Sequence, residues 1–245
     1  MSSPSSCNHK EREGVSEKPV ALVTGATSGI GFAIVEILAT DHDVIACGRS
    51  KAGLERLAAI PHVRPVYLDL TDPASFPPLV AHAPRLDVLV HSAAISERHT
   101  LEQGNPAAWQ TSFAMNVFAP AELTRIFLPA LRATRGQVVF IGSGAGTRAV
   151  PGHIIYSATK FALRAMADAL RLEEVDNGLR VATVAPGPTA TPMNRADRDP
   201  LDTDEPHLAR GSLSDPKAHA AAVRLVVDAP PDSQVTEITV RPRRL

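Results

Sequence analysis

The feature that most constrains the fold is a short apolar segment that runs directly into a glycine-rich turn and then into a helix-forming segment. Residues 19–23 (PVALV) have the length and composition of a buried strand. Glycines follow in the order Gly-x-x-x-Gly-x-Gly over residues 25–31, and the apolar residues of 32–39 have helical spacing. Glycines permit a tight turn, and the unpaired N–H groups and dipole at a helix start favour a phosphate. This segment therefore predicts a strand, a turn and a helix that together bind a phosphate-containing ligand.

Strand-like and helix-like segments continue to alternate along the rest of the chain. Further strands are expected at 43–47, 63–68, 86–90, 137–141, 179–185 and 235–240, and helices at 51–59, over most of 105–133, at 152–176 and at 216–227. Parallel strands joined by right-handed helical crossovers form a sheet with helices on both faces. A chain of 245 residues suits one domain. We therefore expect a single α/β domain with a doubly wound, parallel, seven-stranded sheet.

Two segments lie outside this pattern. Residues 1–18 are rich in Ser and charged residues and are expected to form a flexible tail, because they cannot bury enough apolar surface to offset ordering. Residues 188–214 are irregular, charged and rich in Pro, Asp and Arg. Long unpatterned loops are typically functional or mobile, so we expect this one to be a lid on a site within the domain formed by residues 19–245.

Composition excludes several kinds of partner. The net charge of −1 gives no general attraction to nucleic acid or to an acidic membrane surface. The two cysteines suggest neither a disulfide framework nor a zinc site, and the nine histidines show no metal-binding spacing. No apolar run is long enough to span a membrane or resembles a signal peptide. We expect a cytoplasmic protein without a metal, nucleic-acid or membrane partner.

The end of the second expected strand, Gly48-Arg49-Ser50, lies where a dinucleotide-binding fold meets the adenine ribose. An acidic residue there would accept from the 2′-hydroxyl, whereas Arg49 can pair with a 2′-phosphate. This position favours NADP(H); the alternative is an ordinary solvated arginine. Asp69, after the third expected strand, is a candidate to bond the adenine amino group, or it is a turn residue.

Tyr156 and Lys160 are four residues apart in the helix expected at 152–176, so their side chains share one face. A free phenol, with a pKa near ~10, is a poor proton acceptor at neutral pH. An ammonium group about 4 Å away would favour the phenolate by roughly 4 kcal/mol, or about three pKa units. The pair then suits general acid–base catalysis. The alternative is that Tyr156 only packs and Lys160 points to solvent.

Two further polar residues are candidates to join this pair. Ser143 follows the fifth expected strand within a glycine-rich segment, thirteen residues before Tyr156. Its hydroxyl can fold back beside the phenol, or it is a turn serine. Asn116 lies amid apolar neighbours and must be hydrogen-bonded, either as a strut in the core or as a relay for water.

Together these residues resemble the short-chain dehydrogenase/reductase family over about residues 19–242. The likeness rests on Thr24-Gly-x-x-x-Gly-Ile-Gly31, Asp69, Asn116, Ser143, Tyr156-x-x-x-Lys160 and Pro186-Gly187 through Thr191, in the family's order. The resemblance implies a Rossmann-type fold in which Tyr156 transfers the proton, while Lys160 lowers its pKa and holds the nicotinamide ribose. Ser143 would bond the substrate carbonyl, and Asn116 would hold a relay water. The implied cofactor contacts are Gly25, Thr27, Ser28, Gly29, Ile30, Gly31, Arg49, Ser50, Asp69, Leu70, Ser92, Ala93, Tyr156, Lys160, Pro186, Gly187, Thr189 and Thr191.

One segment departs from the family pattern. Where the family usually has Asn-Asn-Ala-Gly after its fourth strand, this chain has His91-Ser92-Ala93-Ala94. Both asparagine side chains and the glycine are lost. We expect this to change the support of the central sheet and of the loop beside the nicotinamide, but not the proton-transfer group.

The sequence thus predicts an NADP(H)-dependent oxidoreductase that interconverts a carbonyl and an alcohol of a small molecule. The alternatives are a non-catalytic NADP(H)-sensing regulator and an NAD(H)-dependent dehydrogenase of the same fold. The candidate substrate-pocket residues are Ile95, Ala145, His153, Gly187 and Met193, with His153 expected to be a loop residue rather than a second acid. The resemblance also implies a homodimer or homotetramer, assembled through the helices that contain Asn116 and Tyr156.

Overall fold

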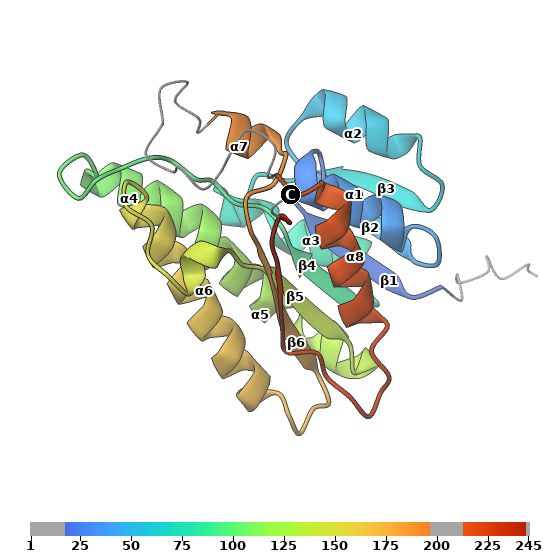
Figure 1. Ribbon diagram of the computed structural model, residues 1–245. Helices are drawn as coiled ribbons and strands as arrows, with labels where there is room; N and C mark the ends of the chain where they lie inside the picture. Colours follow the sequence, from blue (N-terminus) through green and yellow to red (C-terminus); the bar gives the residue numbers. More distant parts are fainter. Residues whose placement is uncertain (1–17, 197–212, 244–245) are drawn as a thin grey trace, which may run out of the picture.

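The computed structural model describes residues 18–196 and 213–243, and its centre is a seven-stranded parallel sheet (Figure 1). The strands are β1 (Val20–Thr24), β2 (Asp43–Gly48), β3 (Val63–Tyr67), β4 (Val88–His91), β5 (Gln137–Ile141), β6 (Arg180–Pro186) and β7 (Glu237–Val240). Their order in the sheet is β3-β2-β1-β4-β5-β6-β7. The order reverses direction between β1 and β4, which is where ligands bind in open α/β sheets. The predicted doubly wound sheet is confirmed.

Helices cover both faces of this sheet. The α-helices are α1 (Gly29–Leu38), α2 (Lys51–Ala58), α3 (Pro77–His82), α4 (Pro106–Phe113), α5 (Ala119–Thr134), α6 (Ile154–Glu173), α7 (Pro192–Ala196) and α8 (Pro216–Val227). Figure 1 shows α4, α5 and α6 on one side of the sheet and α1 and α8 on the other. Short 3₁₀ turns form at Pro73–Ser75 and Gly144–Gly146.

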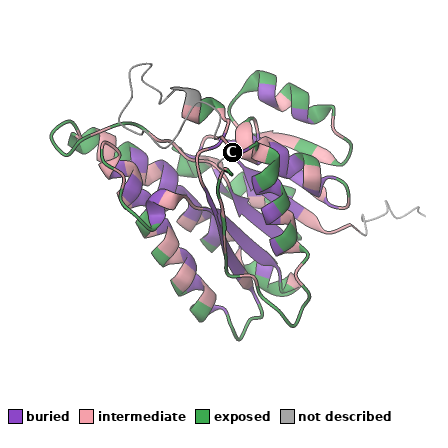
Figure 2. Cartoon of the chain, viewed as in Figure 1, coloured by how far each residue is buried: buried purple, intermediate pink, exposed green. Residues whose placement is uncertain are grey.

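Two apolar cores hold these layers together, one on each face of the sheet. Successive side chains of β1 enter different cores: Leu22 packs with α3, α5 and α6, whereas Val23 packs with α1, α2 and α8. The central strands are buried on both faces (Figure 2), as β4 and β5 show along their whole length. Because both of their faces are covered, these two strands are nearly continuous apolar runs rather than alternating ones.

Three elements differ from the sequence prediction. The expected helix over 105–133 is α4 and α5 joined by a π-helical turn, Ala114–Phe118, that contains Asn116. Helix α6 begins after Gly152, whose φ of 73° is left-handed and incompatible with a helix start there. The segment expected to be irregular contains α7. Residues 1–17 of the expected tail and 197–212 of the expected lid lie outside the described residues.

The two described ends of the expected lid are joined to each other. Ala190 donates its backbone N–H to the carbonyl of Ser214 at 2.9 Å, and Ser214 donates to Pro188 at 3.0 Å. In the described part of the chain, no helix combines the length and apolar character needed to cross a membrane.

Candidate active site

A cleft of about 1380 Å³ lies over the carboxyl ends of the strands. Residues that directly follow β1, β2, β4, β5, β6 and β7 line it, so the site belongs to the edge of the sheet rather than to one local segment. Of the predicted site residues, the cleft is lined by Gly25, Thr27, Ser28, Gly29, Ile30, Gly31, Arg49, Ser50, Leu70, Ser92, Ala93, Ser143, Tyr156, Lys160, Pro186, Gly187, Thr189 and Thr191. Asn116 and Asp69 do not line it.

The turn between β1 and α1 is shaped to receive an anion. Gly25 has a left-handed φ of 66°, and a Cβ there would lie 2.7 Å from the Cα of Ala93. Ser28 caps α1 with extended backbone but makes no side-chain bond to it, whereas Ser50 caps α2 by accepting from the N–H of Gly53. The first N–H groups of α1 are thus left to a group in the cleft. With the helix dipole, they suit the phosphates of a dinucleotide.

Arg49 and Asp69 lie close together beyond β2 and β3. The Arg49 side chain is 52% exposed, and its Nη1 lies 3.5 Å from Oδ1 of Asp69. That oxygen also accepts from the N–H of Thr71 at 2.9 Å and from its hydroxyl at 2.7 Å. Hydrogen bonds from Thr71, and then the charge of Arg49, hold the pKa of Asp69 below its usual value. These are the contacts of a turn aspartate, and its bond to an adenine amino group stays a prediction.

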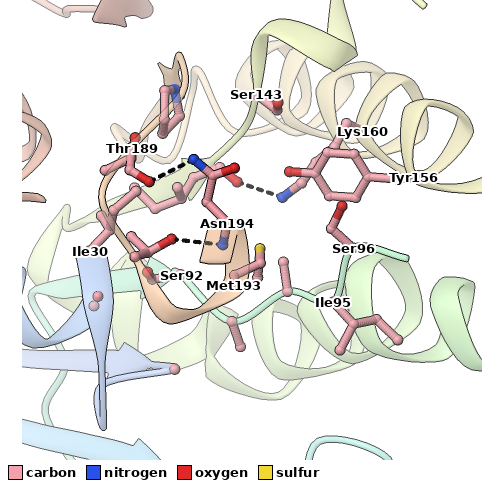
Figure 3. A pocket seen from close by; sticks show the side chains of 18 of the residues that line it. Ile30, Ser92, Ile95, Ser96, Ser143, Tyr156, Lys160, Thr189, Met193 and Asn194 are labelled. Carbon is pink, nitrogen blue, oxygen red and sulfur yellow. Dashed lines mark hydrogen bonds between the residues drawn. The ribbon is translucent and has the colours of Figure 1, made fainter. Parts of the chain in front are cut away.

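Tyr156 and Lys160 both reach the cleft from α6 (Figure 3). The Nζ of Lys160 lies 5.6 Å from the centre of the Tyr156 ring and donates a 2.9 Å hydrogen bond to the backbone carbonyl of Ile141. Only 3% of Lys160 is exposed. The alternative in which Lys160 points to solvent is therefore wrong, because the end of β5 binds its ammonium group next to the phenol.

Burial sets the charge state of Lys160. It lowers the pKa of the ammonium group from 10.5 to about 8, since no carboxylate in the described part of the chain compensates for the lost solvation. At pH 7 the group is still about nine-tenths protonated. A cation therefore remains beside Tyr156 at neutral pH, and it favours the phenolate over the neutral phenol.

Ser143 lies at the end of β5 on the same wall of the cleft (Figure 3). It caps the 3₁₀ turn Gly144–Gly146, and its Oγ accepts from the N–H of Ala145 at 3.1 Å. The turn role that the sequence left open is thus present. It does not exclude a second role, because a hydroxyl that accepts one hydrogen bond keeps a proton that it can donate into the cleft.

Asn116 is a strut beside the site rather than part of its surface. It is 1% exposed; its Oδ1 accepts from the N–H of Ile95 at 2.8 Å, and its Nδ2 donates to the carbonyl of Ile95 at 2.9 Å. Nδ2 also lies 3.1 Å from Oγ1 of Thr159, the neighbour of Lys160. Both amide protons are used within the protein, so the π turn is tied to the Ile95 loop and to α6. The water relay stays a prediction, with one lone pair of Oδ1 to serve it.

Comparison with known proteins decides the family. A family model described as short chain dehydrogenase matches residues 19–202. The chain belongs to this family. An uncharacterised oxidoreductase from Staphylococcus saprophyticus is 31% identical over 237 residues, covering 91% of this chain and 97% of the relative. L-xylulose reductase from Mus musculus is 32% identical over 213 residues, covering 85% of each chain.

Solved structures agree with this assignment. The closed form of a serine dehydrogenase complexed with NADP⁺ matches with a TM-score of 0.83 and 25% identity, covering 91% of this chain and 94% of that one. This short-chain dehydrogenase is therefore an oxidoreductase, and its family uses nicotinamide cofactors. The glycine-rich turn between β1 and α1 and the cleft fit such a cofactor.

In this short-chain dehydrogenase, His91 occupies a family asparagine position as a buried, neutral ring. It is 2% exposed and stacks on Phe140 with 5.0 Å between ring centres. Its Nε2 lies 2.9 Å from Oγ1 of Thr124, which itself donates to the carbonyl of Pro120, so Nε2 is the donor. Burial lowers the pKa of His91 to about 3. His91 therefore joins the sheet to α5 without entering the cleft chemistry.

The loop after β4 is held from the neighbouring strand instead. Oγ1 of Thr24 accepts from the N–H groups of Ser92 at 3.2 Å and Ala93 at 3.3 Å. Thr24 is the last residue of β1 and is 1% exposed. The loss of the two family asparagines was expected to change the support of this loop. The hydroxyl of Thr24, 68 residues before Ser92 in the chain, provides that support here.

The cleft also contains residues that the sequence analysis missed. All five candidate pocket residues line it, but so do Arg148, Asn194 and Arg241. Asn194, on α7, donates from Nδ2 to the carbonyl of Thr189 at 3.0 Å and from its backbone to Oγ1 of Thr191 at 3.3 Å (Figure 3). Nothing in the sequence of α7 signals this attachment. The position of Arg241 could have been predicted, because it directly follows the last strand and the carboxyl ends of parallel strands share one edge of the sheet.

Proposed function

We propose that this short-chain dehydrogenase is an NADP(H)-dependent oxidoreductase that interconverts a carbonyl and an alcohol of a small molecule. The observation that carries the proposal is the buried, cationic Lys160 next to Tyr156 in the cleft at the strand ends. Burying a charge is costly, and here no carboxylate among the described residues offsets the cost. A purely structural position would be served better by an apolar side chain.

Each residue has a distinct role in the proposed reaction. When bound, the nicotinamide cofactor supplies the hydride for reduction or accepts it for oxidation. In reduction, Tyr156 gives its proton to the oxygen as the carbonyl carbon becomes the alcohol carbon, and Lys160 stabilises the phenolate that remains. Ser143 donates a hydrogen bond to the same oxygen. Proton transfer by a positioned acid contributes about 10²–10⁴-fold, and an oxyanion donor about 10²–10³-fold.

We propose NADP(H) rather than NAD(H) because an arginine, and not an acidic residue, directly follows β2. Arg49 lines the cleft there, and among the described cleft residues there is neither Asp nor Glu to repel a 2′-phosphate. Charge-assisted bonds from a guanidinium to a phosphate contribute enough for a preference of about 10–100-fold. Ser50 and Leu70 would contact the adenosine part, and Asp69 the adenine amino group.

The remaining predicted cofactor residues divide between the two ends of the cleft. We propose that the α1 turn holds the pyrophosphate, and that Ser92 and Ala93 flank the nicotinamide side. The nicotinamide amide would lie against the segment after β6, formed by Pro186, Gly187, Thr189 and Thr191, where a threonine hydroxyl and backbone groups are available.

We also propose that the protein is a cytoplasmic homodimer or homotetramer. Three large apolar side chains are exposed just before α5 and along α6: Phe118 (61%), Phe161 (44%) and Leu172 (75%). Exposed apolar patches mark interaction surfaces, and a second copy of the same surface would cover them. A cytoplasmic location fits a sequence with two cysteines, of which Cys47 is free and buried.

The test is NADPH consumption with a panel of aldehydes, ketones and diketones. Turnover of one or more of them is expected, and Tyr156→Phe should lower kcat by about 10²–10⁴-fold without weakening NADPH binding. The matched control is Tyr67→Phe, since Tyr67 is the other tyrosine of the chain and is 65% exposed. Tight NADPH binding without any turnover would favour the regulator instead, and an unaffected Tyr156→Phe would refute the assigned acid.

A further inference from the structure

The cleft carries positive charge at both of its ends. Among the described residues that line it, the cationic side chains are Arg49, Arg98, Arg148, Lys160 and Arg241, and none is Asp or Glu. Arg49 and Lys160 have roles in the proposed function. The other three arginines, Arg98, Arg148 and Arg241, have no role in the proposed function, although they line the same cleft.

Arg241 is placed beside the catalytic loop by the end of the sheet. It follows β7, whose last residue, Val240, accepts a 2.7 Å hydrogen bond from the N–H of Gly187. A Cβ on Gly144 would lie 3.2 Å from Nη1 and 3.3 Å from Nη2 of Arg241. The guanidinium group therefore rests against the backbone immediately after Ser143.

The sheet order separates Arg241 from the dinucleotide phosphates. Arg49 follows β2, next to one edge strand, whereas Arg241 follows β7, the opposite edge strand. The phosphate-binding turn after β1 lies on the Arg49 side of the switch point. A dinucleotide that reaches from Arg49 to Tyr156 thus leaves Arg241 beyond its nicotinamide end. Arg241 belongs to the substrate part of the cleft.

A second guanidinium comes from the same neighbourhood. Arg148 lines the cleft, and its backbone N–H donates to the carbonyl of Gly144 at 3.2 Å. In the described part of the chain, neither Arg148 nor Arg241 forms an ion pair with Asp or Glu. Both are exposed and can reach a ligand.

We propose that the substrate carries an oxyanion, a carboxylate or a phosphate, that pairs with Arg241 while its carbonyl faces Ser143 and Tyr156. Arg148 is the second cation of this subsite. A guanidinium group presents two parallel N–H groups to a carboxylate or phosphate, so the pairing orients the substrate as well as attracting it. This inference rests on the proposed function, since it assigns the substrate class of the same site.

The experiment compares acids with their methyl esters, which keep the reacting carbonyl and lose the charge. The pairs are levulinate and methyl levulinate, and 4-oxobutanoate and its methyl ester; dihydroxyacetone phosphate and dihydroxyacetone form the phosphate arm. Steady-state kinetics with NADPH are measured for the full chain and for Arg241→Met. The control is Arg243→Met, which removes the same charge two residues away at an exposed position that does not line the cleft.

We expect the charged member of at least one pair to be preferred, and Arg241→Met to raise its KM by about 10–100-fold. The neutral member should change by less than about threefold, because it does not use the guanidinium group. Arg243→Met should behave as the parent. The arm that responds, carboxylate or phosphate, identifies the oxyanion.

Several results would overturn the inference. A preference for the neutral member of every pair would overturn it. An equal loss of activity with the charged and the neutral member in Arg241→Met would also overturn it, because it would indicate a structural role. An effect of Arg243→Met as large as that of Arg241→Met would also do so. The calorimetric affinity of the NADP⁺-bound protein for levulinate is measured in parallel. If no carbonyl is turned over but levulinate binding depends on Arg241, the proposed reaction fails and the anion subsite stands; if neither is seen, both fail.

Discussion

Replacing Lys160 by methionine is expected to stabilise the folded protein at neutral pH while removing its catalytic activity. The lysine is 3% exposed, and burial lowers the pKa of its ammonium group from 10.5 to about 8. A folded-state pKa below the unfolded one means that the unfolded chain binds more protons between these two values. The stability of the parent protein therefore rises with pH from about 8 to about 10.5.

The size of this effect follows from the two pKa values. At pH 7 the shift of about 2.5 units costs the folded parent ~3 kcal/mol, at 1.36 kcal/mol per unit. At pH 10 Lys160 is almost wholly neutral in the folded state but still about three-quarters protonated in the unfolded state, and the remaining cost is ~1 kcal/mol. Methionine has neither cost, but it leaves the carbonyl of Ile141 without its partner, a penalty of about 1–3 kcal/mol that does not depend on pH.

The assay is urea unfolding of parent and Lys160→Met at pH 7 and pH 10, at one protein concentration. The difference in unfolding free energy should be about 0–2 kcal/mol in favour of the variant at pH 7, and it should move by ~2 kcal/mol toward the parent at pH 10. Lys217→Met is the control, because Lys217 is an exposed lysine on α8. A difference that is the same at both pH values would refute the argument that a buried cation is held beside Tyr156.

Three other expectations test the cofactor end, the loop support and the assembly. Arg49→Asp should raise the KM for NADPH by about 10–100-fold and leave NADH almost unaffected; unchanged NADPH kinetics would favour the NAD(H) alternative. Thr24→Val should lower the free energy of unfolding by about 1–3 kcal/mol, since it leaves the N–H groups of Ser92 and Ala93 without an acceptor. The same change at Thr40, whose hydroxyl is exposed, is the control, and equal stability of the two variants would count against this account of the loop. Phe161→Glu should reduce the mass of the assembly measured by light scattering, whereas Leu225→Glu, at another exposed apolar position, on α8, should not; an unchanged mass would place the interface elsewhere.

Much of this protein could be predicted because its signals are local. A strand followed by a glycine turn and a helix is encoded within residues 19–39, and the four-residue spacing of Tyr156 and Lys160 places both on one helix face. Alternation of such segments was enough to predict a parallel sheet with helices on both faces. These features depend on backbone hydrogen bonds and side-chain spacing within one or two turns, which a short window of sequence contains.

The partners of these residues were decided only by the tertiary structure. The sequence placed Lys160 near Tyr156, but the fold placed its ammonium group on the carbonyl of Ile141, nineteen residues earlier, and buried it. Likewise, Asn116 proved to be tied to Ile95. Such contacts depend on which strands become neighbours, and the spacing within any one segment does not contain that information.

Arg241 shows this division most clearly. By itself, the sequence determined that an arginine follows the last strand of a parallel sheet, close to the end of the chain. Only the order of strands, with β7 beside β6 and β6 beside β5, brought its guanidinium group to Gly144, 97 residues earlier. The reason is physical: the carboxyl ends of parallel strands share one edge, so side chains distant in the chain meet there to form one site.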